Sequence, residues 1–154
     1  MSLPAHKWLD MPPVWLAGFI AAAWGIDRWR PLNLRLDGGL FDLLGGLLLG
    51  AGLIAMGLAV IEMRKHRTTV IPHMQADTLV RSGIFRHSRN PIYLGDLAVL
   101  AGLILYWGAA LALVLVPVFA LVIERRFILP EEDRLRRRFR QDFHRYTQET
   151  RRWL

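Results

Sequence analysis

The chain has 154 residues, of which 53% are hydrophobic, and it carries a formal charge of +7 at neutral pH. A mean hydropathy of +0.26 is high for a soluble protein, so the composition favours one domain, residues 1–154, that resides in a bilayer. The absence of cysteine excludes disulfides, thiolate metal sites and cysteine nucleophiles. The cations lie beside apolar segments, a pattern typical of contact with anionic lipid headgroups rather than with nucleic acid.

The first half of the chain contains two apolar segments that we expect to span the membrane. The first lies near residues 13–29 and is bordered by tryptophans suited to the membrane interface. The second, residues 39–61, has about the length that a hydrocarbon core requires. Within it, Gly46 and Gly50 have the spacing of a Gly-xxx-Gly helix contact, which predicts close packing against another helix.

The second half contains two further apolar segments, near residues 91–106 and 109–129, separated by a tight break at Gly108. This pattern predicts a helical hairpin, with a kink at Pro117 in its second helix. The fold class is therefore an all-α polytopic membrane bundle of about four transmembrane helices.

Two polar segments complete the predicted architecture: a connector over residues 62–90 and a charged amphipathic helix over residues 130–154. Both are rich in cations, so the positive-inside rule places them in the cytoplasm. Four spans then put the N-terminus and the C-terminus on that side as well. The apolar stripe of the last helix comprises Leu135, Phe139, Phe143 and Tyr146.

The most informative stretch, residues 82–95, places cationic and turn-forming residues directly before an apolar helix. Asn90 is expected to cap the backbone amides of that helix, and Pro91 suits its first position. The positive end of the helix lies beside Arg89, so the local field favours anionic groups of a ligand.

Acidic residues supply the complementary chemistry. Glu131 and Glu132 follow Pro130 where the last helix is expected to begin, so they either cap that helix or hold a ligand's ammonium or hydroxyl groups. Tyr93 lies three residues after Asn90, so its ring and hydroxyl are expected beside the same helix start. The alternative is that Tyr93 anchors the helix at the membrane interface.

Two acids lie within or at the ends of apolar helices, Asp96 and Glu124, and such groups are candidates for function because an unpaired acid there is costly. Glu124 is expected to pair with Arg125 or Arg126. The histidines lack the spacing of a metal site, so no metal is predicted; His87 remains a candidate ligand contact or proton acceptor.

Two motifs resemble the isoprenylcysteine carboxyl methyltransferase family, integral membrane enzymes that use S-adenosylmethionine, and the related phospholipid methyltransferases. Residues 83–95 are similar to the pattern Gly-x-Tyr-x-x-x-Arg-His-Pro-x-Tyr-x-Gly, with Phe85 and Asn90 as departures. Residues 131–146 resemble Glu-Glu-x-x-Leu-x-x-x-Phe-Gly-x-x-Tyr-x-x-Tyr, with Arg140 and Phe143 as departures. The last four residues resemble the family's terminal motif, and residues 68–72 and 79–80 are similar to the bacterial branch.

The resemblance implies that S-adenosylmethionine is the cofactor and that a methyl group passes to a lipophilic acceptor, with a carboxylate such as a prenylated thiol acid expected. It assigns Arg89, His87 and Glu132 as candidate catalytic residues. The implied cofactor-binding residues are Leu79, Val80, His87, Arg89, Asn90, Pro91, Tyr93, Gly95, Glu131 and Glu132. The implied partners are membrane lipids and a lipophilic substrate; the sequence gives no oligomeric state.

Two alternatives stay open at this point. Membrane sterol and steroid reductases, which bind NADPH, have a similar Arg-His-Pro-x-Tyr-x-Gly-Glu segment, in which Asp96 would stand for the last acid. A non-enzymatic membrane adaptor that binds anionic lipid would explain the arginines but not the combination of motifs.

Overall fold

The computed structural model describes residues 10–29, 34–68 and 78–154, and within these ranges all of the regular elements are helical. The motif residues 69–72 lie outside these described ranges. The long helices are α2 (Pro12–Trp29), α3 (Gly39–Lys65), α4 (Pro91–Trp107), α5 (Leu115–Ile123) and α6 (Leu129–Glu149). The short ones are the 3-10 helices η1 (Gly83–Arg86) and η2 (Ala110–Val114) and the π-helical turn η3 (Glu124–Ile128). The prediction of an all-α protein is confirmed.

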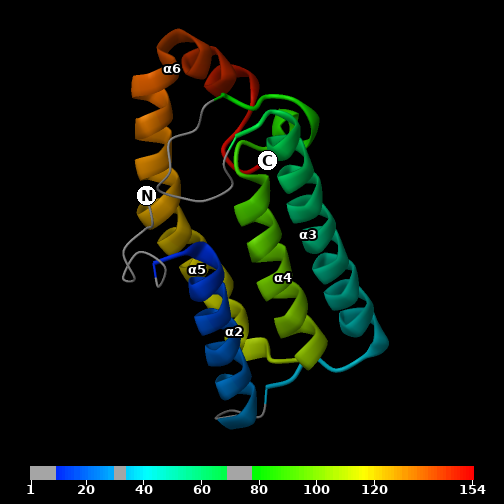
Figure 1. Cartoon of the computed structure of the whole chain (residues 1–154). Helices are drawn as coiled ribbons and strands as arrows, with labels where there is room; N and C mark the ends of the chain where they lie inside the picture. The colour runs from blue at the N-terminus through cyan, green and yellow to red at the C-terminus, as the bar shows by residue number, and fades with distance from the viewer. Residues whose placement is uncertain (1–9, 30–33, 69–77) are drawn as a thin grey trace.

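Helix α4 is the centre of the bundle, because it packs on α3 along one side and on α2 and α5 along the other. Figure 1 shows α3 and α4 running side by side, while α5 continues through η3 into α6 as one long rod. The main apolar cluster lies between α4, α5 and α2 and includes Leu100, Ile104, Phe119 and Ile123. This arrangement brings the start of α4 and the start of α6 to the same end of the bundle.

One helix of the described chain, α3, is long and apolar enough to cross a membrane by length and composition; α4 is apolar but shorter. The segment expected as one helix over residues 109–129 consists instead of η2, α5 and η3, and Pro117 lies in the first turn of α5 rather than at a kink within a long helix. The break at Gly108 is confirmed, since this residue ends α4 in the left-handed conformation with φ 68°. The structure thus supports a membrane helix at α3, and the number of spans stays a prediction.

The contact between α3 and α4 depends on glycines that the Gly-xxx-Gly spacing did not identify. A Cβ on Gly45 would lie 2.7 Å from the carbonyl oxygen of Gly102, and a Cβ on Gly52 would lie 2.7 Å from that of Gly95. Gly46, in contrast, has no atom within 4 Å of the position its Cβ would take, so the expected packing face was wrong. The two backbones approach closely because four glycines oppose each other in two pairs.

Adjacent glycines of α3 provide a matched test of this packing. We expect Gly45→Ala to lower the free energy of unfolding by about 1–3 kcal/mol, because its Cβ would meet backbone atoms of α4 that cannot move independently. The control Gly46→Ala should be neutral or stabilising by about 0.5–1 kcal/mol, the ordinary gain from replacing glycine in a helix. Denaturation in detergent measures both, and equal effects would contradict the assigned helix face.

Two irregularities shape the rod formed by α5 and α6. Pro130 has no N–H, and in a regular α-helix its ring would clash with the carbonyl four residues earlier. That carbonyl lies in the wider π-helical turn η3, which makes room for the proline ring. The sequence predicted that the last helix begins near Glu131. In the structure the helix instead continues from α5 through this turn into α6. Further on, Arg140 has φ 40° and ψ −106°, and α6 bends there so that its last turns cross over the end of the bundle.

The bend at Arg140 occupies a backbone region that side chains disfavour, and we expect Arg140→Gly to raise the free energy of unfolding by about 1 kcal/mol. The control Arg137→Gly, at an exposed position within the regular part of α6, should lower it by about 1 kcal/mol. Thermal unfolding in detergent would show shifts of opposite sign. A loss of stability in both variants would contradict the bend.

Candidate functional site

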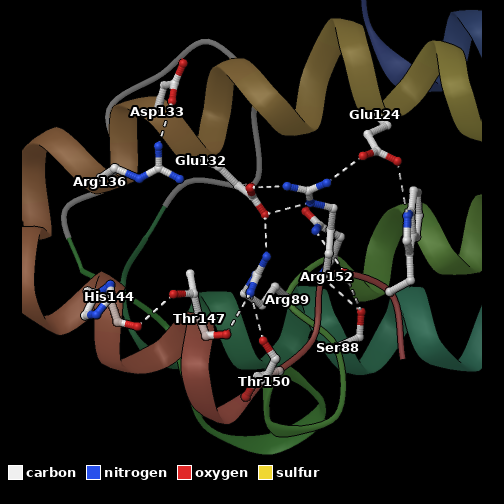
Figure 2. A network of polar contacts seen from close by, with 12 residues as sticks. Ser88, Arg89, Glu124, Glu132, Asp133, Arg136, His144, Thr147, Thr150 and Arg152 are labelled. Atoms are coloured by element: carbon white, nitrogen blue, oxygen red, sulfur yellow. Dashed lines mark hydrogen bonds and ion pairs between the residues drawn. The ribbon is translucent and has the colours of Figure 1, made fainter.

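The two motifs meet at the carboxylate of Glu132. Arg89, 43 residues earlier in the chain, donates a hydrogen bond from its terminal guanidinium nitrogen to Glu132 Oε1 at 2.9 Å. Arg152 donates to both oxygens of the same carboxylate, at 3.1 Å and 2.8 Å. Figure 2 shows the guanidinium groups of Arg89 and Arg152 converging on the carboxylate of Glu132. The side chains of Arg89 and Glu132 are only 10% and 8% exposed, so solvent screens this pair weakly.

Arg89 also joins the last residues of the chain to the start of α4. Its guanidinium donates to the carbonyl oxygens of Thr147 at 3.3 Å and Thr150 at 2.9 Å, while its backbone N–H donates to the carbonyl of Arg151 at 3.0 Å. Its Nε is buried and has no hydrogen-bond partner among the described residues. A buried N–H donor is therefore left over after the contacts among the described residues are made.

Asn90 does not cap α4 as expected. Its side-chain amide donates to the backbone carbonyl of Arg152 at 3.0 Å, and no side-chain hydrogen bond caps the helix. The C-terminal segment competes successfully for this amide because it runs directly beside the turn, where Ser88 also donates to the same carbonyl at 3.4 Å. Within the part of the chain that the structure describes, no side chain of the N-cap residue accepts a hydrogen bond from the first backbone amides of α4, and the positive end of the helix is uncapped by Asn90.

Glu124 is the second carboxylate that holds the C-terminal segment. It accepts a hydrogen bond from Arg152 at 2.5 Å and one from the indole N–H of Trp153 at 3.4 Å. The expected partners, Arg125 and Arg126, were wrong; Arg126 pairs with Asp10 at 2.6 Å instead. The π-helical turn directs Glu124 and Glu132 toward the same guanidinium, a juxtaposition that the sequence does not encode as a simple spacing.

Beside this network, Tyr93 of α4 and Glu131 of α6 are also brought together. The phenol of Tyr93 donates to Glu131 Oε2 at 3.4 Å, and its ring lies against Phe127 with centroids 6.4 Å apart. Because the helix continues through η3, there is no free helix end at Glu131 for a carboxylate to cap. The alternative of simple capping is therefore weakened, and an acidic group and a hydroxyl lie next to the uncapped start of α4.

The remaining predicted site residues differ in how far they are buried. Leu79 is half-buried, and Val80 is buried in a small cluster with Phe85 and Ala59. Pro91 is buried at the start of α4, whereas the side chain of His87 is exposed. Gly95 faces α3, where a Cβ would clash with Met56, so the structure places it in the helix contact rather than beside Tyr93.

The loop that carries the first motif is fastened to the end of α3. Ser82 donates to Glu62 Oε1 at 2.5 Å, and the His66 ring nitrogen lies 2.7 Å from the same hydroxyl. The hydrogen bond from Ser82, followed by one from Lys65, holds the pKa of the Glu62 carboxyl below its usual value. On the other side, Tyr146 donates to the carbonyl of Phe85 at 2.7 Å, so the loop is anchored to both α3 and α6.

The electrostatics of Glu132 decide its charge state. Burial by itself would raise the pKa of this carboxyl, but the hydrogen bonds from Arg152 and Arg89 outweigh burial and hold the pKa below its usual value. Glu132 is therefore ionised at neutral pH. Within the described ranges, no group of three or more metal-ligating side chains occurs.

Comparison with known protein families matches residues 41–142 to the phospholipid methyltransferase family. The match covers more than half of the chain, which belongs to this family, part of the isoprenylcysteine carboxyl methyltransferase-like group of integral membrane methyltransferases. The family resemblance inferred from the motifs is thereby confirmed, and the chain is assigned to methyltransferases that act on lipid-like substrates, while the bacterial branch stays a prediction. No curated protein and no solved structure was found to match the chain.

Sequence reasoning missed the part played by Arg152. The terminal motif was noticed as a resemblance, but only the fold shows that Arg152 reaches both Glu124 and Glu132. The sequence did contain a signal for such an ion pair, because two acids near an apolar helix require positively charged partners and several arginines lie nearby. Choosing among those arginines requires the bend at Arg140, which directs the end of the chain back toward α4.

Glu132 generates a stability prediction with a neighbouring control. We expect Glu132→Gln to lower the free energy of unfolding by about 3 kcal/mol, because two guanidinium groups lose their shared carboxylate. The control Asp133→Asn should cost less than about 1 kcal/mol, since its pair with Arg136 is exposed on both sides. Denaturant titration in detergent measures both, and equal losses would contradict a special role for Glu132.

The pH dependence follows from the lowered pKa of Glu132. A group with a lowered folded-state pKa stabilises fully above its unfolded value of 4.5, and this stabilisation is lost as the pH falls through the folded value. Wild type should therefore lose stability below about pH 4.5 more steeply than Glu132→Gln. Parallel curves for the two proteins would show that Glu132 is not held ionised by the arginines.

Proposed function

We propose that this protein transfers a methyl group from S-adenosylmethionine to a lipophilic acceptor that enters from the bilayer. The observation that carries the proposal is the joining of the two motifs at the Arg89–Glu132 pair, beside Tyr93 and Glu131 and at one end of the helix that centres the bundle. Family membership favours this function over an NADPH-dependent reductase and over a lipid-binding adaptor.

The groups present fit the chemistry of such a cofactor. Its amino-acid end carries a carboxylate and an ammonium group, and its nucleoside carries hydroxyls. The uncapped amides at the start of α4 and the unpartnered Nε of Arg89 are donors suited to a carboxylate. Glu131 and the Tyr93 hydroxyl are suited to an ammonium or hydroxyl group. Leu79, Val80, Asn90, Pro91 and Glu132 complete the proposed binding region, whereas Gly95 faces α3 and is left out of it.

The protein's own contribution would be mainly positioning. When bound, the cofactor supplies an electrophilic methyl group, so no covalent enzyme intermediate is required. Arg89 is proposed to contact the ligand, and Glu132 acts through Arg89 by fixing its guanidinium. His87 is exposed and is proposed as a contact at the entrance. The apolar side chains around Phe127 exclude water, which favours a reaction in which charge is neutralised.

The orientation expected from the positive-inside rule belongs to the same proposal. The cationic end of α3, with Arg64 and Lys65, lies at the same end of the bundle as α6. We propose that this end faces the cytoplasm, which supplies the water-soluble cofactor, and that the acceptor arrives laterally from a bacterial inner membrane. A carboxylate acceptor, a lipid amine and a fatty acid are distinguished by a transfer screen with a labelled methyl group.

Cofactor binding is tested by calorimetry of the detergent-purified protein with S-adenosylhomocysteine. Wild type should bind, and Tyr93→Phe and Glu131→Gln should each weaken binding by about tenfold or more, because each removes a hydrogen-bonding group from the proposed site. The control Tyr106→Phe, at the exposed far end of the same helix, should bind as wild type does. Absence of binding in wild type, or unchanged affinity in both site variants, would contradict the proposal.

A further inference from the structure

One buried acid takes no part in the network or in the proposed function. Asp96 of α4 is 1% exposed, and its Oδ2 has no hydrogen-bond partner among the described residues. Glu124 and Glu132 show the contrast, since both of these acids are held by Arg152. An acid in an apolar helix without such compensation is expensive to keep, so a packing role does not account for it.

The position of Asp96 connects it to the site. It follows Tyr93 by three residues, which places the two side chains on neighbouring parts of the same helix surface, about 4.5 Å apart along the axis. Tyr93 contacts Glu131 at the end of the bundle, so Asp96 lies one turn further along α4 from that end. This direction leads into the apolar part of α4, which is the side from which the proposed function has a lipophilic acceptor arrive.

We propose that Asp96 is the proton acceptor of the methyl transfer, an inference that rests on the function proposed above. The attacking atom of a neutral acceptor gives its proton to the Asp96 carboxylate and forms a bond to the methyl carbon. The carbon–sulfur bond of the donor breaks at the same time, and its electron pair stays on sulfur. The positive charge of the donor and the negative charge of Asp96 both disappear, and the proton passes to water after product release.

This charge balance selects the acceptor. A nucleophile that carries a proton, such as an amine, uses Asp96 and ends with no charge in the apolar region. An ionised carboxylate acceptor has no proton to give, and it would bring a second negative charge next to a buried acid. The inference therefore favours a protic acceptor over the carboxylate expected from the sequence resemblance.

The decisive variant is Asp96→Asn, which keeps the shape of the side chain but cannot accept a proton. Transfer of a labelled methyl group to hexadecylamine should fall by about 100-fold or more relative to transfer to palmitate, which has the same chain length and a carboxylate head. The ratio of the two rates is independent of the folded fraction. Asp42→Asn, at an exposed position in the first turn of α3, is the control and should leave the ratio unchanged. An unchanged ratio in Asp96→Asn would overturn the inference.

A binding measurement gives an answer without turnover. In protein saturated with S-adenosylhomocysteine, the dissociation constant for hexadecylamine should rise about tenfold in Asp96→Asn, because a carboxylate accepts a stronger hydrogen bond from the N–H of the neutral amine than an amide oxygen does. Equal dissociation constants would overturn the role of Asp96. If Asp96→Asn still binds S-adenosylhomocysteine as wild type does, such a result leaves the proposed function standing. Failure of wild type to bind S-adenosylhomocysteine would overturn both.

Discussion

The shared carboxylate of Glu132 is the interaction on which the rest of the site depends. Two guanidinium groups, from Arg89 and Arg152, converge on it from segments that are far apart in the chain. A single arginine would leave one side of a buried carboxylate uncompensated, whereas two fix both the charge and the orientation of the group. The start of α4, the first turns of α6 and the C-terminal segment are thereby held in one arrangement.

The helix bundle supplies the frame for that arrangement. Four glycines let α3 approach α4 closely along one side, while α2 and α5 cover the other side with an apolar cluster. The start of α4 is then the place where a polar loop, a helix N-terminus and two acids of α6 meet. Exposed leucines on α3 are consistent with a helix that faces hydrocarbon, as is expected in a family of integral membrane methyltransferases.

Much of this could be predicted from the sequence. Hydrophobic runs located α2, α3 and α4 to within a few residues, and the contacts of Arg89 with Glu132 and of Tyr93 with Glu131 agree with the expectation that the two motifs converge. These predictions worked because helix periodicity is a local property and because each motif contains complementary charges. The convergence of the motifs was expected from their shared side of the membrane.

The predictions that failed concern residues whose partners are decided by tertiary contacts rather than by local sequence. Asn90 is a residue type that often caps helices, but its side-chain amide donates to the carbonyl of Arg152 instead. Gly46 has the spacing of a helix-contact glycine, but α4 packs on the neighbouring face of α3. In a helix with many glycines several spacings coexist, and only the partner helix selects one. The bend at Arg140 was also missed, although the resembling family pattern has glycine there, the residue that accepts φ 40° without strain.

The measurement that tests the account most directly is a double-mutant cycle between Arg89→Gln and Glu132→Gln, with the free energy of unfolding as the readout. If the two motifs meet as described, the two changes should be coupled by about 1–3 kcal/mol, because removal of either partner already eliminates their contact. Strictly additive effects would show that these residues do not touch and that the two motifs do not form one site.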